Sequence, residues 1–307
     1  MPPEAAAPTG YAHPAYVEAL SEFGRPLALP ASGGWLLERP IGTTGLADAM
    51  GAYPLFCCTD WMALSEDWNT LRGRELVSAV LVADPFGRHD APLLEKCFDR
   101  VAAFKMHFVI DLQQPGPYGT AHHRQCARRA FRDMAVEVAS LDEAMLGEWA
   151  TLYQHLIERH AIAGMRAFSR ESFRRQFAVP GLLCFRAASR SGECVAAHLW
   201  FTQDEVAYSH LAAANGCGYR LGASYALYSA AIEFFRGKVS CLNLGGGAGS
   251  KDGSDGLTKF KAAWANTART AYLCGKILNP QRYHELAAAA GARGAEYFPA
   301  YRYADAA

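Results

Sequence analysis

Three side chains that can transfer protons lie on two neighbouring apolar segments of the C-terminal half. Tyr208 and His210 stand two residues apart in the run Val206–Ala212, and alternation along a strand places both on one face. His198 lies in the preceding run, Val195–Phe201. Histidine can take the proton of an ammonium group, and tyrosine can donate to a leaving thiol or hydroxyl. These residues are candidates for acid–base catalysis, although a single histidine in a strand is more often a structural residue.

The elements that would position these residues follow one another in a regular order. Short polar turns separate three consecutive apolar runs, which predicts a meander of three strands. The predicted strands of this half cover residues 134–139, 182–188, 195–201, 206–212, 239–244 and 269–277. The predicted helices cover residues 142–160, 169–177, 223–236 and 256–264, and a glycine-rich loop at 215–222 precedes the third helix.

The first half of the chain also alternates strands with helices. Its predicted strands cover residues 35–41, 55–58, 77–83 and 105–112, and its predicted helices cover residues 61–71 and 92–103. Loop formers are most concentrated at residues 113–119, and a predicted helix at 122–131 follows. We therefore expect an α/β protein with two domains, residues 13–118 and 119–303.

Composition limits the compartment and the partners. The chain has 307 residues, 51% of them hydrophobic, and its 30 Lys and Arg residues balance its 30 Asp and Glu residues, so no global field favours a polyanion. We find no apolar run of about 18 residues and no secretory signal, which predicts a cytoplasmic protein without a membrane span. The nine scattered cysteines are typical of buried thiols, and we expect no metal site.

Several segments resemble the GNAT acyltransferase fold, and specifically its Fem-type branch of aminoacyltransferases. They are Val195-Ala196-Ala197-His198-Leu199, Tyr208-Ser209-His210-Leu211, Gly218–Phe235, Leu242-Asn243-Leu244-Gly245-Gly246 and the helix Gly256–Trp264 with its Phe260-Lys261 pair. The resemblance covers about the last 145 residues. It implies tandem GNAT-like domains, the first degenerate, each with a mixed, mostly antiparallel sheet flanked by helices.

The resemblance also implies a donor site before the central helix, where free N–H groups favour phosphates. Its candidate residues are Tyr219, Arg220, Gly222, Ala223 and Ser224, together with Gly245, Gly246 and Phe260. The usual coenzyme A pattern has an Arg or Gln three residues before the first glycine. This chain has Tyr219 there and Arg220 displaced by one, so coenzyme A is a less obvious donor. Alternatively, these glycines only shape a turn.

The resemblance gives Lys261 a role near the transferred carbonyl or near the donor's ribose and phosphate. An ammonium group beside a developing oxyanion in a water-poor site is worth about 2.7–4 kcal/mol, by analogy with one oxyanion-hole donor. The alternative is a solvated lysine, as we expect for Lys259.

Candidate acceptor-binding residues are Tyr53, Asp60, Tyr118 and His122, which stand at predicted strand ends or loops. If the donor is a tRNA, arginines would position its phosphates, and the candidates are Arg124, Arg128, Arg129, Arg174 and Arg175. Solvated helix faces are the simpler explanation of such arginines.

The function predicted from these residues is amide-bond formation. An aminoacyl or acyl group would pass from aminoacyl-tRNA, slightly favoured, or from acyl-coenzyme A to a small-molecule, peptide or sugar-linked amine. Both donors would be co-substrates, and we expect no permanently bound cofactor. The alternative is a catalytically silent GNAT-like module that binds a ligand or RNA.

Overall fold

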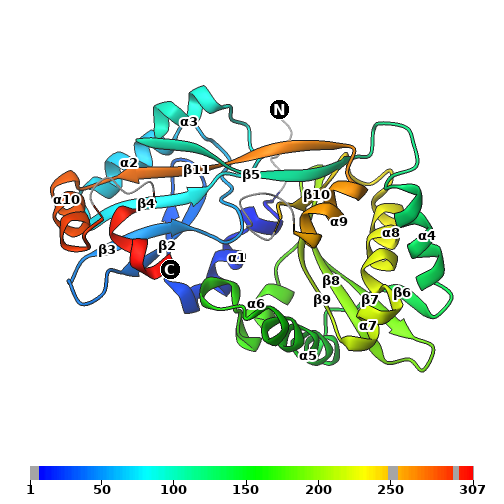
Figure 1. Ribbon diagram of the computed structural model, residues 1–307. Helices are drawn as coiled ribbons and strands as arrows, with labels where there is room; N and C mark the ends of the chain where they lie inside the picture. The colour runs from blue at the N-terminus through cyan, green and yellow to red at the C-terminus, as the bar shows by residue number, and fades with distance from the viewer. Residues whose placement is uncertain (1–6, 248–254, 293–296, 307) are drawn as a thin grey trace. The chain divides into compact units, whose positions relative to one another are not determined.

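The computed structural model describes residues 7–247, 255–292 and 297–306 (Figure 1). The chain forms two compact units: unit 1 comprises residues 1–16 and 105–269, and unit 2 comprises residues 17–104 and 270–307. These bounds differ from the expected domains, residues 13–118 and 119–303, because strands β5 (Arg100–Asp111) and β11 (Thr267–Ile277) each run from one unit into the other. Helix α1 (Pro14–Ala19) does the same near the N-terminus.

Unit 1 is built on a sheet with the strand order β5-β10-β9-β8-β7-β6. The remaining strands are β6 (Met134–Ala139), β7 (Leu182–Ser189), β8 (Cys194–Gln203), β9 (Val206–Ala214) and β10 (Cys241–Gly245). Neighbours run antiparallel except β9 and β10, which run parallel.

Different helices cover the two faces of this sheet (Figure 1). The helical elements are η1 (Gly10–Ala12), α4 (Ala121–Ala130), α5 (Glu143–His160), η3 (Gly164–Arg166), α6 (Arg170–Phe177), α7 (Gly216–Leu221), α8 (Ala223–Phe235) and α9 (Gly256–Trp264). On one face α8 packs its small residues Ala226 and Ala231 into a core that contains Trp200. On the other face α5 and α6 meet through the edge-to-face rings of Trp149 and Phe173, 5.5 Å apart.

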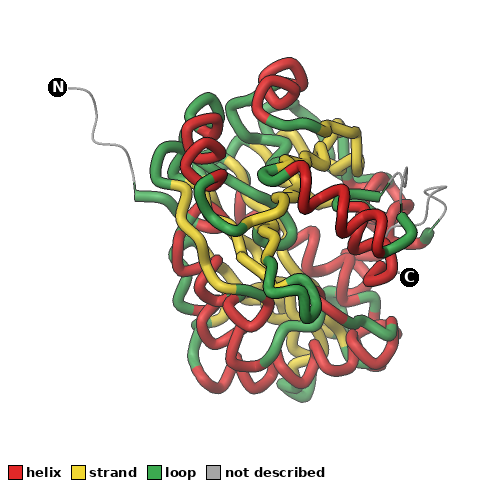
Figure 2. Tube along the Cα trace, turned by 90° about the vertical axis from the view of Figure 1, so that its left-hand side faces the viewer, coloured by secondary structure: helices red, strands yellow, loops and turns green. Residues whose placement is uncertain are grey.

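Unit 2 is a smaller version of the same architecture, with the strand order β1-β2-β3-β4-β11. Its elements are η2 (Ser21–Phe23), β1 (Arg25–Leu29), β2 (Gly34–Pro40), β3 (Ala47–Gly51), α2 (Leu64–Arg72), β4 (Leu76–Val82), α3 (Ala91–Cys97), α10 (Pro280–Ala289) and η4 (Ala300–Ala306). Only β3 and β4 pair in parallel. Each unit therefore has the expected mixed, mostly antiparallel sheet flanked by helices. Figure 2 marks the helices and strands by colour in a second view.

The first half departs from the predicted elements at several places. The helix predicted at residues 92–103 ends at Cys97, because Asp99 accepts hydrogen bonds from the Ile277 amide (2.7 Å) and the Lys276 ammonium (2.9 Å) and so joins β11. Of the strand predicted at residues 55–58, only one bridge forms, between Phe56 and Ala83. Strands β1 and β3 and helix α10 were not predicted. Among the described residues, no helix is long and apolar enough to cross a membrane.

Asp48 is one of the buried acidic side chains of unit 2. Its side chain is about 1% exposed and pairs with Arg39 (3.2 Å) and Arg302 (2.5 Å), while the Tyr301 hydroxyl donates to it at 3.2 Å. Removing the charge leaves two guanidinium groups without their shared carboxylate, which typically costs about 3–5 kcal/mol. We expect Asp48→Asn to lower the free energy of unfolding by that order, as measured by urea denaturation.

Glu38→Gln is the matched control, since the Glu38–Arg25 pair is exposed on the arginine side. Surface pairs contribute about 0–1 kcal/mol, so this variant should unfold close to wild type. Equal losses in the two variants would contradict this stabilising role of Asp48.

Candidate active site

The parallel strands β9 and β10 pair only as far as Tyr208 and Asn243. Beyond that point β9 continues to Ala214 with an irregularity at His210, which has no partner in the register with β8. Strand β10 instead turns at Gly245, whose φ is +74°. The Gly245 amide donates to Asn243 Oδ1 at 2.9 Å and holds this turn. Where two strands of a sheet separate beside a β-bulge, backbone N–H and C=O groups are no longer paired between the strands and can bind a ligand.

Lys261 of α9 bonds to this turn. Its ammonium donates to the Gly246 carbonyl at 2.8 Å, and a Cβ built on Gly245 would lie 3.4 Å from Nζ. Asp255 caps the start of α9 by accepting from the Thr258 amide at 2.9 Å. A Cβ on Gly247 would come 1.9 Å from Thr258 Oγ1, so the turn and the helix fit closely.

The cations of this site lie in a poorly solvated environment. Burial lowers the pKa of Lys261 to about 8, and the charge of Lys105 contributes to the shift while Asp255 opposes it. Burial also lowers the pKa of Lys105, helped by Arg166 of η3. Near neutral pH Lys261 is still mostly charged, so it can stabilise a developing negative charge.

Sequence reasoning did not identify His107 on β5. Its Nδ1 lies 3.1 Å from Asn243 Oδ1, and burial together with Lys261 lowers the pKa of His107 to about 4. Its only sequence signal was a polar residue within an apolar strand. Because Val109 pairs with Asn243 and Asn243 pairs with Tyr208, residues His107, Asn243 and Tyr208 share one face of the sheet.

His210, a candidate base, has both ring nitrogens engaged. Nδ1 lies 3.0 Å from the Tyr11 hydroxyl and Nε2 lies 3.0 Å from Gln176 Oε1. Burial lowers its pKa to about 3. Tyr208 lies on the same side, with its ring 5.4 Å from that of Tyr11, as alternation predicted.

His198, the other candidate base, lies on the opposite face, against α8. Its ring centroid is 4.6 Å from that of Trp200 and 4.9 Å from that of Tyr228, and its Nε2 lies 2.8 Å from Ser209 Oγ. Its Nδ1 is enclosed without a hydrogen-bond partner. Burial, with a smaller contribution from Lys261, lowers its pKa to about 3.

The segment expected to form a phosphate-binding loop is mostly helical. Asn215 caps α7 by accepting from the Gly218 amide at 2.9 Å, and a Cβ on Gly218 would lie 2.3 Å from the Val195 carbonyl. Gly222, with a φ of +73°, joins α7 to α8. The exposed ring of Tyr219 lies under the Arg159 guanidinium, 4.1 Å away.

The other donor candidates lie around this segment and the turn after β10. Arg220 is exposed, Ala223 is buried and Ser224 is half-buried, all near the start of α8. Phe260 packs inward, with its ring 5.0 Å from that of Tyr228.

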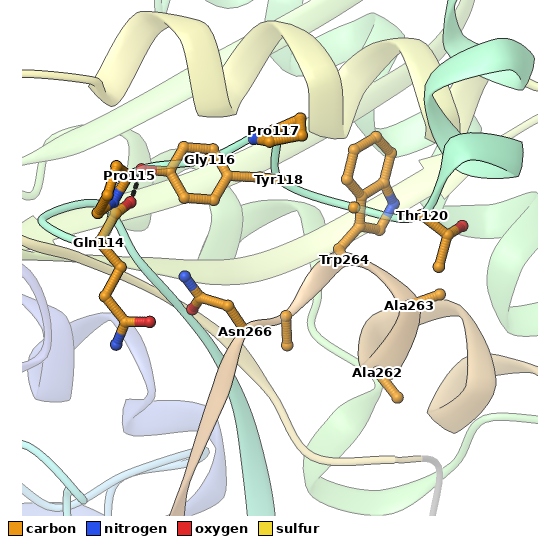
Figure 3. A pocket seen from close by; sticks show the side chains of 12 residues that line it. Gln114, Pro115, Gly116, Pro117, Tyr118, Thr120, Ala262, Ala263, Trp264 and Asn266 are labelled. Carbon is orange, nitrogen blue, oxygen red and sulfur yellow. Dashed lines mark hydrogen bonds between the residues drawn. The ribbon is translucent and has the colours of Figure 1, made fainter.

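The candidate acceptor residues occupy separate places. Tyr118 lines a surface hollow of about 310 Å³ with Trp264 and Asn266, and its hydroxyl donates to the Gln114 carbonyl at 2.9 Å (Figure 3). His122 is exposed on α4.

Tyr53 and Asp60 belong to unit 2, where Asp60 accepts from the Met62 amide at 2.8 Å ahead of α2.

The arginines proposed for tRNA form two groups. Arg128 and Arg129 are exposed at the end of α4, whereas Arg124 donates to the Gly119 carbonyl at its start. Arg174 and Arg175 on α6 both pair with Glu171, at 2.5 and 2.9 Å.

No protein-family model matches this sequence, and no curated protein matches it. Among solved structures, FemX matches at 13% identity with a TM-score of 0.66, covering 91% of this chain and 95% of that chain. L-PGS from Bacillus licheniformis matches at 15% identity with a TM-score of 0.60, covering 90% and 94%.

The C-terminal domain of a putative lysylphosphatidylglycerol synthetase from Agrobacterium fabrum matches at 16% identity with a TM-score of 0.63, covering 89% of each chain. At such identities these matches establish the fold. The resemblance to the Fem-type branch of the GNAT fold is confirmed at that level.

Lys261 should make the free energy of unfolding depend on pH. An unfolded lysine has a pKa of about 10.4, whereas the pKa of Lys261 in the fold is about 8. Between these values the unfolded state binds more protons, so the free energy of unfolding rises with pH. We expect wild type to gain stability relative to Lys261→Met between about pH 7.5 and about pH 10, measured by urea denaturation. A constant difference would show that Lys261 ionises as an ordinary lysine.

Proposed function

We propose that unit 1 transfers an acyl or aminoacyl group to an amine and forms an amide bond. The observation that carries this proposal is the Lys261 ammonium, held by the Gly246 carbonyl where β9 and β10 separate. A partly desolvated cation fixed beside this turn suits a carbonyl oxygen that becomes negative.

The reaction balances without a cofactor. The neutral amine attacks the carbonyl carbon of an ester or thioester, and the new C–N bond forms as the carbonyl oxygen becomes an oxyanion. Lys261 donates a hydrogen bond to that oxyanion. When the intermediate collapses, the C–O or C–S bond breaks, and the leaving hydroxyl or thiol receives the proton that the amine loses.

Aminoacyl-tRNA is the donor that we favour over acyl-coenzyme A. The residues before α8 form the short helix α7 instead of an open glycine loop, and Gly218 is pressed against the Val195 carbonyl. This arrangement gives coenzyme A phosphates less room than the usual loop would. The exposed pair Arg128 and Arg129 offers a sequence-independent contact for a phosphate backbone.

The fold supports the same choice. FemX and a lysylphosphatidylglycerol synthetase domain share it over about nine-tenths of the chain. The Fem-type branch, which the sequence resembles, consists of aminoacyltransferases. The acceptor in this proposal is an amine on a small molecule, a peptide or a sugar.

Lys261→Ala should lower the turnover number about tenfold or more with little effect on the apparent affinity for the donor, because its charge acts mainly on the transition state. Lys259→Ala is the matched control, since Lys259 is an exposed lysine two residues away on α9. Equal turnover of folded Lys261→Ala and wild type would remove Lys261 from the reaction.

The donor is tested by thermal stability with a panel of acyl-coenzyme A esters and by a gel shift with bulk aminoacylated tRNA. We expect the tRNA to shift and the coenzyme A esters to leave the melting temperature unchanged, because only a ligand that binds the folded state stabilises it. Stabilisation by a coenzyme A ester without a tRNA shift would reverse the choice of donor.

A further inference from the structure

Four histidines of unit 1 are buried, and their hydrogen bonds decide which of them can meet a substrate. His123 has Nδ1 3.1 Å from Thr120 Oγ1, and its Nε2 is enclosed without a partner. His210 uses both ring nitrogens within the protein, with Tyr11 and with Gln176. His198 uses Nε2 with Ser209, and its Nδ1 is sealed in the core. His107 Nδ1 is hydrogen-bonded to Asn243. Several buried side-chain nitrogens of the described residues have no hydrogen-bond partner, and His107 Nε2 is not one of them.

The proton on His107 can be placed from its neighbours. Asn243 Oδ1 accepts the Gly245 amide at 2.9 Å, so the atom facing the imidazole is the carbonyl oxygen of the side-chain amide. An oxygen of this kind cannot donate, and therefore His107 Nδ1 carries the hydrogen of the 3.1 Å contact. In the neutral ring Nε2 is then a lone-pair acceptor.

His107 lies on the strand that borders the turn to which Lys261 is hydrogen-bonded. A Cβ on Gly246 would touch Lys105 Cβ and the Met106 carbonyl, each at 3.3 Å, so β5 runs directly beside the turn whose carbonyl binds Lys261. Lys105 and Lys261 are the cations near the imidazole, and Asp255 is near both ammonium groups.

We propose that His107 Nε2 accepts a hydrogen bond from the attacking amine and so holds the nucleophile beside the carbonyl that Lys261 polarises. This inference rests on the proposed function and adds to it a preference for the neutral form of the amine. Two nearby ammonium groups disfavour a charged acceptor, and a neutral imidazole accepts from a neutral amine. The site would thus select the acceptor in its nucleophilic form.

His107 could instead only support Asn243, and two substitutions separate these roles. In His107→Asn, the side-chain amide nitrogen replaces Nδ1 as a donor, and no atom replaces Nε2. In His107→Gln, the side-chain amide oxygen lies near the former position of Nε2, and the hydrogen bond to Asn243 is lost. If His107 binds the amine, His107→Gln should remain the more active variant. If it only supports Asn243, His107→Asn should be the more active one.

The kinetic test uses bulk aminoacylated tRNA as donor and hydroxylamine, an amine that is largely neutral near neutral pH, as acceptor. We expect His107→Asn to lower kcat/KM for hydroxylamine about tenfold or more, His107→Gln to lose less, and the tRNA gel shift to be unchanged in both. A more active His107→Asn, or equal activity of the two variants, would overturn the proposal.

A second measurement does not need turnover. In the long-range ¹H–¹⁵N spectrum of the imidazoles, with His107→Asn for assignment, His107 should be protonated at Nδ1. Hydroxylamine should shift its Nε2 resonance to saturation, and methylammonium at the same concentration should not. Protonation at Nε2, or no shift with hydroxylamine, would overturn the proposal. If wild type does not transfer the aminoacyl group to hydroxylamine but hydroxylamine shifts the Nε2 resonance to saturation, the proposed function is rejected. His107 would then still bind an amine.

Discussion

Asn243 Oδ1 receives two hydrogen bonds, and the geometry of the candidate site depends on both. The Gly245 amide donates one, which fixes the turn that ends β10. His107 Nδ1 makes the other, which ties β5 to that turn across 136 residues of sequence. A single carbonyl oxygen with two lone pairs thereby sets the direction of the Gly246 carbonyl, and that carbonyl sets the position of the Lys261 ammonium.

The site concentrates positive charge where water is scarce, which works against folding. The pKa values of Lys105, His107 and Lys261 are all lowered by burial, and each is lowered further by a neighbouring cation. Such an arrangement is costly for the free protein, and in the proposed reaction the developing oxyanion would relieve it. Differential stabilisation of this kind is what raises a turnover number, because the substrate itself does not carry the charge.

The local elements could be predicted where residue pattern and structure agree. Strand β6 and helix α9 have their predicted bounds, and Tyr208 shares the face of His210 as alternation required. Helix α7 could not be predicted, because its glycines disfavour a helix and tertiary contacts, among them the Asn215 cap and the close approach to Val195, stabilise it. Strand β3, Ala-Asp-Ala-Met-Gly, lacks β-branched residues and forms by pairing with β2 and β4.

The site itself was only partly visible in the sequence. Lys261 could be selected as a candidate because the Phe260-Lys261 pair on a short helix resembles Fem-type proteins. His107 could not be selected, because the pairing of β5 with β10 brings it to Asn243, and no local pattern encodes that pairing.

The crossing of β5 and β11 from one unit into the other also affects how the sequence encodes each unit. Unit 1 needs η1 from the beginning of the chain, where the Gly10 amide donates to Pro180 at 2.9 Å, and β5 from before the loop at 113–119. No single stretch of the gene encodes it. The sheet of unit 2 is divided in the same way, because a fragment that carried residues 17–104 alone would encode β1 to β4 without their neighbour β11.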